Sequence, residues 1–475
     1  METASSQSYY NEVQSLFTEI LDRPAGVSGY DFFGNELASG TPIGTVFNQI
    51  AGSAEASADI NNMTAEQQVT YLFENLLGRA PLSGGLTYWS AQIATQGIAA
   101  VAQGIYNDVL GEPITSADHM VMGDTIQGDN FFTTSNRIAN SLVNANVYTL
   151  TSTDTGHTFA SSSSQPDTLV IPFDYLYSNL GQAGNSQYFT FQGDASGYNA
   201  VDINYDPVYT STISYYLQNA TNFQILDFNY SQSDYSNLYS SPIDLSTINS
   251  GFNTFILDDT YNTGTVDSYS DYGFTNATNN DTFVVQATTM ELDIYSSANG
   301  NDGNAANLIM DGGAGGVGLG TFVFSPSSAS VSNPTVNIYS VGSTLNTIQA
   351  MGDMFVTGNN LTGSFTINVY GSDQLSIGSA SDQPYTASNN VDNGIELQDG
   401  STLTINGDSA NSNLIAYIYE NSPTQTQGVT VNAAGFAGTL SLIDEFSSAY
   451  TSPNTFILVR EPTPSRLITL TPPLP

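Results

Sequence analysis

The sequence contains no cysteine, which excludes disulfide bonds, thiol catalysis and thiolate metal sites. It also contains no lysine: its 5 basic residues are all arginine, against 44 acidic residues, so the formal net charge is −39. A chain this acidic repels phosphate backbones, which excludes nucleic acid as a partner. So many unmatched carboxylates repel one another on folding unless divalent ions bind among them or an acidic medium protonates some. Calcium is the natural extracellular candidate.

Catalytic signals are also scarce. His119 and His157 are the only histidines, and no His-Glu-x-x-His zinc motif is present, which excludes that class of metalloprotease. A polysaccharide-cleaving enzyme would use paired carboxylates, but such sites generally recruit lysine or several arginines for acidic substrates. We therefore expect no catalytic residues and no enzyme activity, and we interpret each histidine as a surface or capping residue.

No stretch approaches the length of a transmembrane helix, and residues 1–11 contain no cleavable secretion signal. If the protein is exported, the signal is expected at the C-terminus. There the proline-rich tail, 460–475, cannot form a helix. It is open to three interpretations, namely an uncleaved export signal, an arm that reaches a neighbour or a frayed end.

Residues 1–147 have helical periodicity and contain an internal repeat. The segment Leu16 to Pro24 aligns with Leu72 to Ala80 at an offset of 79 − 23 = 56, and the same offset pairs Phe33 with Trp89. The pattern predicts two helical repeats, at about 9–50 and 65–110, in which Arg23 and Arg79 cap helix ends or fix the turns. A further helix is predicted over roughly 130–146.

Residues 148–475 consist of short alternating apolar runs separated by Asn, Gly, Ser and Asp, which is typical of short strands joined by tight turns. Similar strand starts recur, as in Asn253-Thr254-Phe255 and Asp281-Thr282-Phe283, which predicts stacked rungs. The predicted fold is thus α + β and multidomain: a small helical repeat domain, then a long β-rich region resembling a β-helix or β-roll. A division of this region near 300–320 is left open. A β-sandwich is the alternative.

The motifs Leu-Leu-Gly-Arg-Ala-Pro at 76–81 and Gly-Gly-Leu-Thr-Tyr-Trp at 84–89 resemble a short, uncharacterised helical module common in RTX-type exported surface proteins. Together with the long β region, this part of the chain resembles the surface-layer proteins of Gram-negative bacteria that type I systems export. The resemblance implies a helical domain that anchors to lipopolysaccharide, a β domain that builds a lattice through calcium, and a C-terminal secretion signal. Intact Gly-Gly-x-Gly-x-Asp calcium repeats are absent.

Calcium takes six to eight oxygen ligands, which turns rich in Asp, Asn and Gly can supply. The first candidates lie in and beside degenerate glycine-rich turns, and Asp258 and Asp259 end a predicted strand. The alternative is that these residues only form turns through their own side chains. In order of preference, the candidate ligands are Asp302, Asn304 and Asp311, then Asp258 and Asp259, then Asp267 and Asp271.

The function that these features favour is a structural subunit of a calcium-dependent bacterial surface layer, located outside the cell. Its partners would be other copies of itself, in a two-dimensional lattice, and lipopolysaccharide or another surface polysaccharide. The 28 tyrosines support extensive self-association, because tyrosine offers large contact area with little entropy to lose. A secreted adhesin or carbohydrate-binding protein is the alternative function, and glycan binding without lattice formation would distinguish it.

Overall fold

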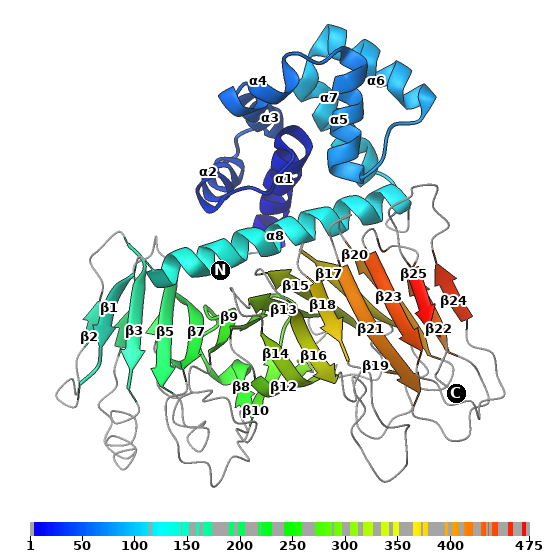
Figure 1. The fold of residues 1–475 in the computed structure, drawn as a ribbon. Coiled ribbons are helices and arrows are strands. Elements are labelled where there is room, and N and C mark those ends of the chain that lie inside the picture. The colour runs from blue at the N-terminus through cyan, green and yellow to red at the C-terminus, as the bar shows by residue number, and fades with distance from the viewer. Residues whose placement is uncertain are drawn as a thin grey trace. The chain divides into compact units, whose positions relative to one another are not determined.

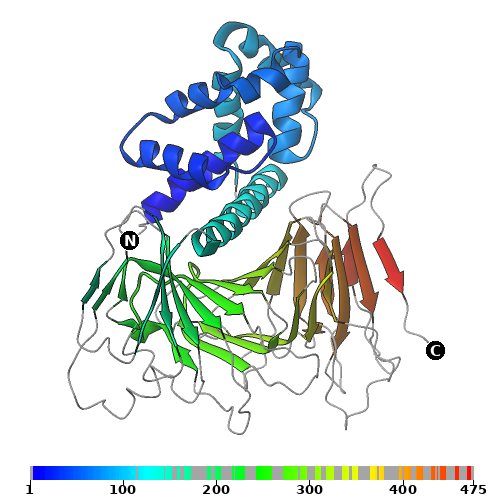
Figure 2. The same ribbon diagram turned by 60° about the vertical axis from the view of Figure 1, so that its left-hand side comes forward.

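The chain divides into two compact units, Met1–Arg137 and Ile138–Pro475, in the computed structural model. The ribbon drawings in Figures 1 and 2 show both units from two sides. The structure describes residues 4–113, 116–143, 145–151, 158–160, 165–172, 190–193, 198–204, 217–218, 220–229, 242–258, 271–286, 289–296, 305–311, 317–325, 334–341, 345–350, 364–371, 374–378, 395–397, 401–407, 413–420, 429–433, 436, 439–444, 455–458 and 468–471.

Eight helices are described in the N-terminal part of the chain. They are α1 (Ala4–Leu21), α2 (Val27–Ala38), α3 (Ile43–Ala51), α4 (Ala54–Ile60), α5 (Ala65–Leu77), α6 (Ser83–Gln96), α7 (Ile98–Leu110) and α8 (Ala117–Val143). None of these helices is both long enough and apolar enough to cross a membrane. The last helix, α8, begins earlier than the predicted residue 130, because the Ser116 side chain accepts from the His119 N–H and so caps the first turn.

The repeated sequence forms a repeated structure. Helices α1, α2 and α3 are followed 56 or so residues later by α5, α6 and α7, and Leu16 and Leu72 are both fully buried at equivalent positions. Both first helices end in the left-handed conformation, at Asp22 with φ 51° and at Gly78 with φ 62°. Phe33 and Trp89 both pack against the apolar core of the helical unit. The offset read from the sequence is therefore an offset between equivalent elements.

Local signals explain where these helices begin. Helix α5 starts with a capping box in which the Thr64 hydroxyl accepts from the Gln67 N–H at 3.3 Å and the Gln67 side chain accepts from the Thr64 N–H at 2.9 Å. Two orphan N–H groups of the first turn are thereby satisfied. The apolar side chains then recur at helical spacing and lie on one buried face.

The second unit is a parallel β-solenoid in which most successive strands alternate between the larger sheet and the sheets of the opposite side. The larger sheet contains β1 (Asn146–Thr149), β3 (Asp167–Ile171), β5 (Asn199–Asn204), β7 (Phe223–Asn229), β9 (Thr254–Asp258), β11 (Thr282–Val285), β13 (Ala305–Asp311), β15 (Thr335–Val341), β17 (Ser364–Tyr370), β20 (Thr402–Gly407), β22 (Thr430–Ala433) and β24 (Thr455–Leu458), in this order.

The opposite side of the solenoid starts with a small sheet and continues with a longer one. The small sheet contains β2 (Thr158–Ala160), β4 (Thr190–Gln192) and β6 (Ala220–Thr221). The longer one contains β8 (Ile243–Asp244), β10 (Asp271–Ala277), β12 (Thr289–Ser296), β14 (Gly318–Ser325), β16 (Asn346–Ala350), β18 (Gln374–Ile377), β21 (Asn413–Glu420), β23 (Thr439–Asp444) and β25 (Ile468–Thr471), while β19 (Ile395–Leu397) pairs with β21 and the 3₁₀ turn Leu245–Thr247 follows β8.

The predicted fold class, helices followed by a β-helix, is confirmed. All pairings between described strands are parallel, which excludes the antiparallel β-sandwich that was the alternative. The strands that start at Thr254 and Thr282 lie on neighbouring rungs and pair with each other, with Phe255 opposite Phe283. Residues 320–322, Gly-Thr-Phe, have a similar sequence but lie in the other sheet, since β14 pairs with β12 and β16.

One apolar core runs through the solenoid, from Leu169 to Leu442, and it includes buried side chains of β13 and β14. Inward-facing aromatic side chains fill its middle, where Phe274 of one sheet lies 5.5 Å from Phe255 and 4.9 Å from Phe283 of the other, between ring centroids. Each rung buries its apolar side chains mainly against the rungs next to it, as is usual for a solenoid.

A ladder of asparagine side chains crosses four neighbouring strands of the larger sheet. Asn337 donates to Asn307 at 2.9 Å, Asn368 donates to Asn337 at 2.9 Å, and Asn406 donates to Asn368 at 3.0 Å. The first member, Asn307, donates to the backbone carbonyls of Asn279 and Asp281. Because each amide both donates and accepts along the stack, the ladder holds β13, β15, β17 and β20 in register.

Candidate functional site

Two exposed aromatic side chains occupy equivalent positions in the two helical repeats. Phe32 of α2 is 57% exposed and Tyr88 of α6 is 56% exposed, and their positions differ by 88 − 32 = 56. Burying a large aromatic side chain is normally favourable, so the same exposed position in both repeats is not explained by packing. The repeat therefore presents an aromatic ring at the surface twice.

Each exposed ring is held by an inner ring that packs on the core. Phe32 meets Phe33 edge to face with centroids 5.0 Å apart and planes at 81°, and Tyr88 meets Trp89 with centroids 4.9 Å apart and planes at 76°. The inner rings are anchored in turn, and Trp89 lies against Gly104 so closely that a Cβ there would come within 2.7 Å of the indole. Rings held in this way form flat platforms for another ring or for a sugar face.

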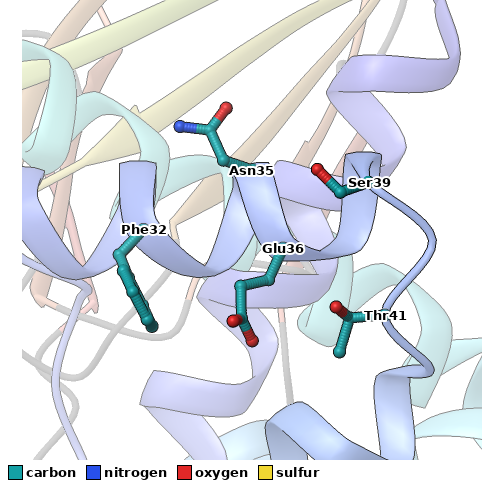
Figure 3. A pocket seen from close by; sticks show the side chains of 5 residues that line it. All are labelled: Phe32, Asn35, Glu36, Ser39 and Thr41. Atoms are coloured by element: carbon teal, nitrogen blue, oxygen red, sulfur yellow. The ribbon is translucent and has the colours of Figure 1, made fainter.

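A shallow depression of ≈ 300 Å³ lies beside Phe32. Phe32, Asn35, Glu36, Ser39 and Thr41 line it, and Figure 3 shows Phe32 and Glu36 projecting to the same side of α2. The Glu36 Oε2 atom is buried and accepts no hydrogen bond from any described residue. An aromatic ring beside a carboxylate, an amide and two hydroxyl groups is the chemistry that binds a sugar, by stacking and by hydrogen bonds.

The second repeat has a different polar set around its exposed ring. The residues equivalent to Asn35, Glu36 and Ser39 are Ala91, Gln92 and Thr95, at the same offset of 95 − 39 = 56. The aromatic position is therefore shared, whereas the carboxylate is present in the first repeat only. Two platforms with different polar neighbours are suited to two units of one polymer, or to two different sugars.

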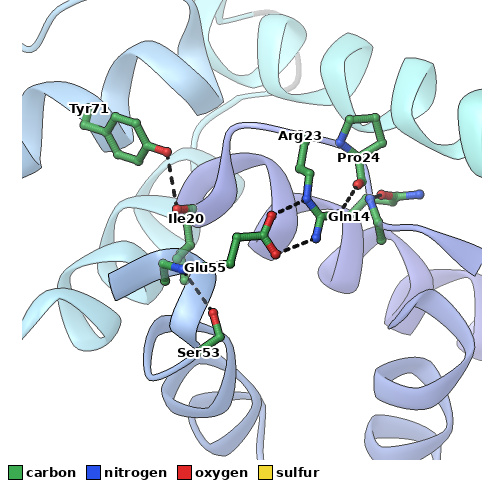
Figure 4. Close-up of polar contacts among 9 residues, drawn as sticks. Gln14, Ile20, Arg23, Pro24, Ser53, Glu55 and Tyr71 are labelled. Atoms are coloured by element: carbon green, nitrogen blue, oxygen red, sulfur yellow. Dashed lines mark hydrogen bonds and ion pairs between the residues drawn. The ribbon is translucent and has the colours of Figure 1, made fainter. Parts of the chain in front are cut away.

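The arginines of the helical unit are engaged in structural contacts. Arg23 donates to the Pro24 carbonyl at 2.9 Å and forms a two-pronged ion pair with Glu55, with its Nη2 2.8 Å from Oε2 (Figure 4). Its guanidinium carbon lies 5.2 Å from the centre of the Phe17 ring. These contacts tie down the turn after α1, as the sequence predicts. The hydrogen bonds with Glu55 raise the pKa of Arg23 above the ordinary value of an arginine.

The second repeat uses its arginine in the same way. Arg79 donates to the Ala80 carbonyl at 3.1 Å, pairs with Asp118 of α8 and lies 5.5 Å from the centre of the Phe73 ring. The third described arginine, Arg137, pairs with Asp31. All three are thus occupied by carboxylates of the same unit, so an anionic ligand would have to compete with them.

The core of the helical unit contains a buried carboxylate that is not paired with any of these three described arginines. Glu19 of α1 is fully buried, and neither of its carboxylate oxygens accepts a hydrogen bond from a described residue. Burial raises the pKa of Glu19 well above its ordinary value. Burial, helped by the charges of Glu12 and Glu19, also raises the pKa of Tyr106 to about 12. Position 19 is equivalent to position 75, where the second repeat has a neutral asparagine.

A second buried carboxylate lies in the solenoid, in the turn before β11. Asp281 is 7% exposed, and its Oδ2 atom accepts from the Thr278 N–H at 2.6 Å and from the Thr278 hydroxyl at 3.1 Å. Burial raises the pKa of Asp281 to about 6, although the two hydrogen bonds oppose the shift. This residue shapes a turn between rungs.

The described candidate calcium ligands are not brought to one place. Asp258 ends β9 and Asp311, which is half-buried, ends β13, with β11 between those strands, so they are two strand spacings, roughly 10 Å, apart along the sheet. Asp271 begins β10 in the other sheet. Asp259, Asp267, Asp302 and Asn304 lie outside the described residues.

The strand register places acidic residues opposite one another in pairs that the sequence alone does not predict. Asp202 of β5 is opposite Asp227 of β7, and Asp271 of β10 is opposite Glu291 of β12. Like charges at directly opposite positions oppose strand pairing, unless a cation or a proton intervenes. Nevertheless, among the residues described, no three acidic, histidine or cysteine side chains come together as a metal site.

The histidines contribute no candidate chemistry in the described part of the chain. His119 lies in the first turn of α8, where its Nδ1 atom is 3.2 Å from the Val109 carbonyl oxygen. This contact links α8 to the end of α7. His157 lies outside the described residues.

The exposed aromatic pair is the feature that sequence reasoning missed. The offset that aligns Phe33 with Trp89 also aligns the preceding residues, Phe32 with Tyr88, and both precede the packing residue by one position. Residues one apart on a helix point about 100° away from each other, so the outer member of each pair could have been assigned to the surface from the sequence.

Comparison with known proteins gives one match. Residues 47–107 match the model of a domain of unknown function, DUF4214. The matched segment begins in α3 and ends in α7, so it includes most of the second helical repeat and the Tyr88 platform. No curated protein and no solved structure matches the chain. The protein thus has a DUF4214 domain within an N-terminal helical region, followed by a β-solenoid.

Proposed function

We propose that this protein is a structural subunit of a bacterial surface layer, exported and assembled outside the cell. In this proposal the β-solenoid forms the lattice, calcium supports the assembly, and the helical unit anchors the layer to lipopolysaccharide or another surface polysaccharide. The protein acts by binding and self-association and catalyses no reaction. Residues 9–110, which resemble the module of exported surface proteins, support export by a type I system.

The observation that carries the proposal is the long solenoid with one uninterrupted core. Parallel strands stacked rung on rung make a rigid body. Each end of the stack exposes a strand edge of the kind that pairs with the next rung inside it. A body of this kind suits mechanical and scaffolding functions, because it can be extended or tiled without refolding. The formal charge of −39 adds a requirement for cations between copies at neutral pH.

The anchoring part of the proposal is supported by the twin platforms, Phe32 and Tyr88. The described arginines are engaged in internal ion pairs, so recognition would rely on ring stacking and neutral hydrogen bonds rather than on cation contacts with phosphate. Weak sugar sites gain affinity when one polymer engages two of them at once. A polysaccharide with repeating units is therefore the ligand class that fits a repeated site.

Calcium would act where acidic residues occupy opposite register positions on neighbouring strands. Asp202 with Asp227 and Asp271 with Glu291 are the pairs that the register supports. The glycine-rich segment that includes Asp302 and Asn304 also stays a proposed site, together with Asp258, Asp259, Asp267 and Asp311. Calcium tolerates irregular oxygen cages, so a turn with few fixed ligands can be completed by a second copy or by water.

Anchoring can be tested by pelleting the protein with lipopolysaccharide vesicles that carry or lack their polysaccharide chains. We predict binding only to vesicles with polysaccharide, and a loss of roughly three- to tenfold in affinity for Phe32→Ala and for Tyr88→Ala. Leu82→Ala is the matched control, because Leu82 is 76% exposed and lies outside both platforms. Equal binding to both kinds of vesicle, or an equal loss in the control, would contradict the anchoring site.

The alternative, a secreted adhesin, is supported by the same platforms. An adhesin would bind glycans and stay dispersed in the presence of calcium. Particle size measured by dynamic light scattering during glycan binding therefore separates the two functions: ordered growth with calcium supports the surface layer, and unchanged particle size with intact glycan binding supports the adhesin.

A further inference from the structure

The two ends of the larger sheet are open in the described structure. Strand β1 pairs with β3 and strand β24 pairs with β22, and neither pairs with a second described strand. Each therefore presents one row of backbone N–H and C=O groups on its outer edge. Because all neighbours in this sheet are parallel, the outer edge of β24 has the direction and hydrogen-bonding pattern that would pair with the outer edge of β1.

The end strands have the composition of interior strands. Strand β24 reads Thr-Phe-Ile-Leu, and the same four residues occupy 254–257 of β9, which is paired on both sides. Strand β1 reads Asn-Val-Tyr-Thr. Neither strand contains a charged residue or a proline, which are the usual means of protecting an exposed edge, although the chain carries a formal charge of −39.

Apolar side chains are exposed at these ends. Val147 is 61% and Tyr148 is 38% exposed in β1, and Ile457 is 46% exposed in β24, whereas most apolar strand residues between them are buried. Tyr148 is opposite Leu169 of the core, so it occupies an inward position at the end of the column. Phe456, opposite Val431, occupies the inward position at the other end and packs against the core.

We propose that copies of this protein join end to end, with β24 of one copy pairing in parallel with β1 of the next. The inference rests on the proposed self-assembly and names its contact. In this register Phe456 of one copy stacks on Tyr148 of the next, and Ile457 lies opposite Thr149. The solenoid already contains such a contact, because Phe255 and Phe283 of neighbouring rungs stack with centroids 5.3 Å apart and planes at 25°.

The contact is between two different surfaces, so each copy keeps one free end after joining. Contacts of this kind do not close on themselves unless a rotation brings them into a ring, and they produce linear polymers. The four-residue strands alone bury little area, and the facing strands on the other side of the solenoid enlarge the contact. There, β2 reads Thr-Phe-Ala and β25 reads Ile-Thr-Leu-Thr, and both are also uncharged.

Engineered disulfides test the register directly, because the natural chain has no cysteine. Parallel neighbouring strands place opposite Cα atoms about 5 Å apart, within the range that a disulfide bridges. We predict that full-length Thr149→Cys mixed with full-length Ile457→Cys forms one covalent dimer under mild oxidation. Neither variant alone should form it. The double variant, T149C with I457C, should give a ladder of covalent dimers, trimers and longer species.

The control pairs Thr149→Cys with Tyr295→Cys, since Tyr295 is 37% exposed but lies in the middle of the solenoid, on β12. Equal dimers in the control or in single variants would overturn the register. Circular dichroism verifies that each variant is folded. Ordered sheets in calcium without cross-links would overturn the end-to-end contact but not the surface layer. A cross-linked ladder without sheets would support the contact and contradict the layer. The absence of both the ladder and the sheets would overturn both proposals.

Discussion

The turns that end α1 and α5 are equivalent, yet one uses aspartate and the other glycine. Asp22 has φ 51° and Gly78 has φ 62°, and the left-handed conformation is unfavourable for residues with a Cβ. The carboxylate of Asp22 adds a second cost: partial burial, and then the charge of Asp59, raise the pKa of Asp22. The first repeat thus holds a residue that its backbone does not favour.

We predict that Asp22→Gly stabilises the helical unit by about 0.5–1 kcal/mol, because it removes the Cβ penalty and the nearby like charge. Urea unfolding followed by Trp89 fluorescence measures this, since Trp89 is the only tryptophan and lies in α6. Asp22→Ala is the control, which removes the charge but keeps the Cβ. Equal stabilisation by both variants would assign the effect to charge alone.

The buried Glu19 side chain makes the stability of the helical unit depend on pH. Its pKa is raised by burial, so between the unfolded value of about 4.3 and its folded value the native chain holds a proton that the unfolded chain has lost. The stabilising contribution is therefore complete below about pH 4 and is lost as pH rises through the folded pKa. An acidic surrounding medium would favour the native helical unit through this residue.

We predict that Glu19→Gln raises the free energy of unfolding at pH 8 by on the order of 1–3 kcal/mol and leaves it nearly unchanged at pH 4. The neutral amide also reproduces the chemistry of Asn75, the equivalent residue of the second repeat. Unfolding midpoints followed by Trp89 fluorescence from pH 4 to pH 8 give the change of stability with pH. If this pH dependence is the same in the variant as in the natural chain, groups other than Glu19 control it.

Among the elements, the asparagine ladder is the feature most specific to this solenoid. Its interior member, Asn337, is 9% exposed and both donates to Asn307 and accepts from Asn368. Its terminal member, Asn406, only donates within the ladder, to Asn368. Deleting a buried amide costs the lost hydrogen bonds and leaves its partners unsatisfied.

We predict that Asn337→Ala destabilises the solenoid by about 2–4 kcal/mol and Asn406→Ala by only about 1 kcal/mol. Chemical unfolding followed by far-ultraviolet circular dichroism measures both variants against the natural chain. The comparison is internal, because both substitutions remove the same side chain from one ladder. Equal losses would mean that the ladder does not act as a connected unit.

The elements differ in how far their sequence determines them. Helical spacing and the 56-residue offset predicted α1 and α5, because apolar residues such as Leu16 and Leu72 recur on one face. Alternation predicted a β-helix, and Thr254 and Thr282 correctly marked neighbouring rungs. The start of α8 was not predicted, because Gly123 and Gly128 interrupt the helical pattern before residue 130 and the start is marked by one capping serine, Ser116.

The sites were less predictable than the fold. Opposition of Asp202 and Asp227 depends on the register of β5 and β7, which shifts at a bulge between Asn199 and Ala200. Local sequence does not determine how two strands far apart in the chain align, so the pairing of Asp202 with Asp227 could not be predicted from the sequence. The platform at Phe32 and Tyr88 was not predicted either, although the offset and the helical period contain the signal for it.

For the whole molecule, charge and architecture impose opposite demands. A rigid solenoid with uncharged ends favours association, whereas a formal charge of −39 keeps copies apart at neutral pH. Divalent ions reconcile the two by neutralising carboxylates between copies. Protonation would do the same only in a medium near the intrinsic carboxyl pKa of about 4, so assembly at neutral pH should depend on calcium.

Electron microscopy of the full-length protein at neutral pH, before and after addition of millimolar calcium, tests this account most directly. The account predicts dispersed particles without calcium, ordered sheets or tubes with calcium, and dispersal again when a chelator is added. Magnesium at the same concentration is the control for simple charge screening, because it prefers a rigid octahedral site and keeps its water. Particles that stay dispersed with calcium would contradict calcium-driven assembly and favour the adhesin.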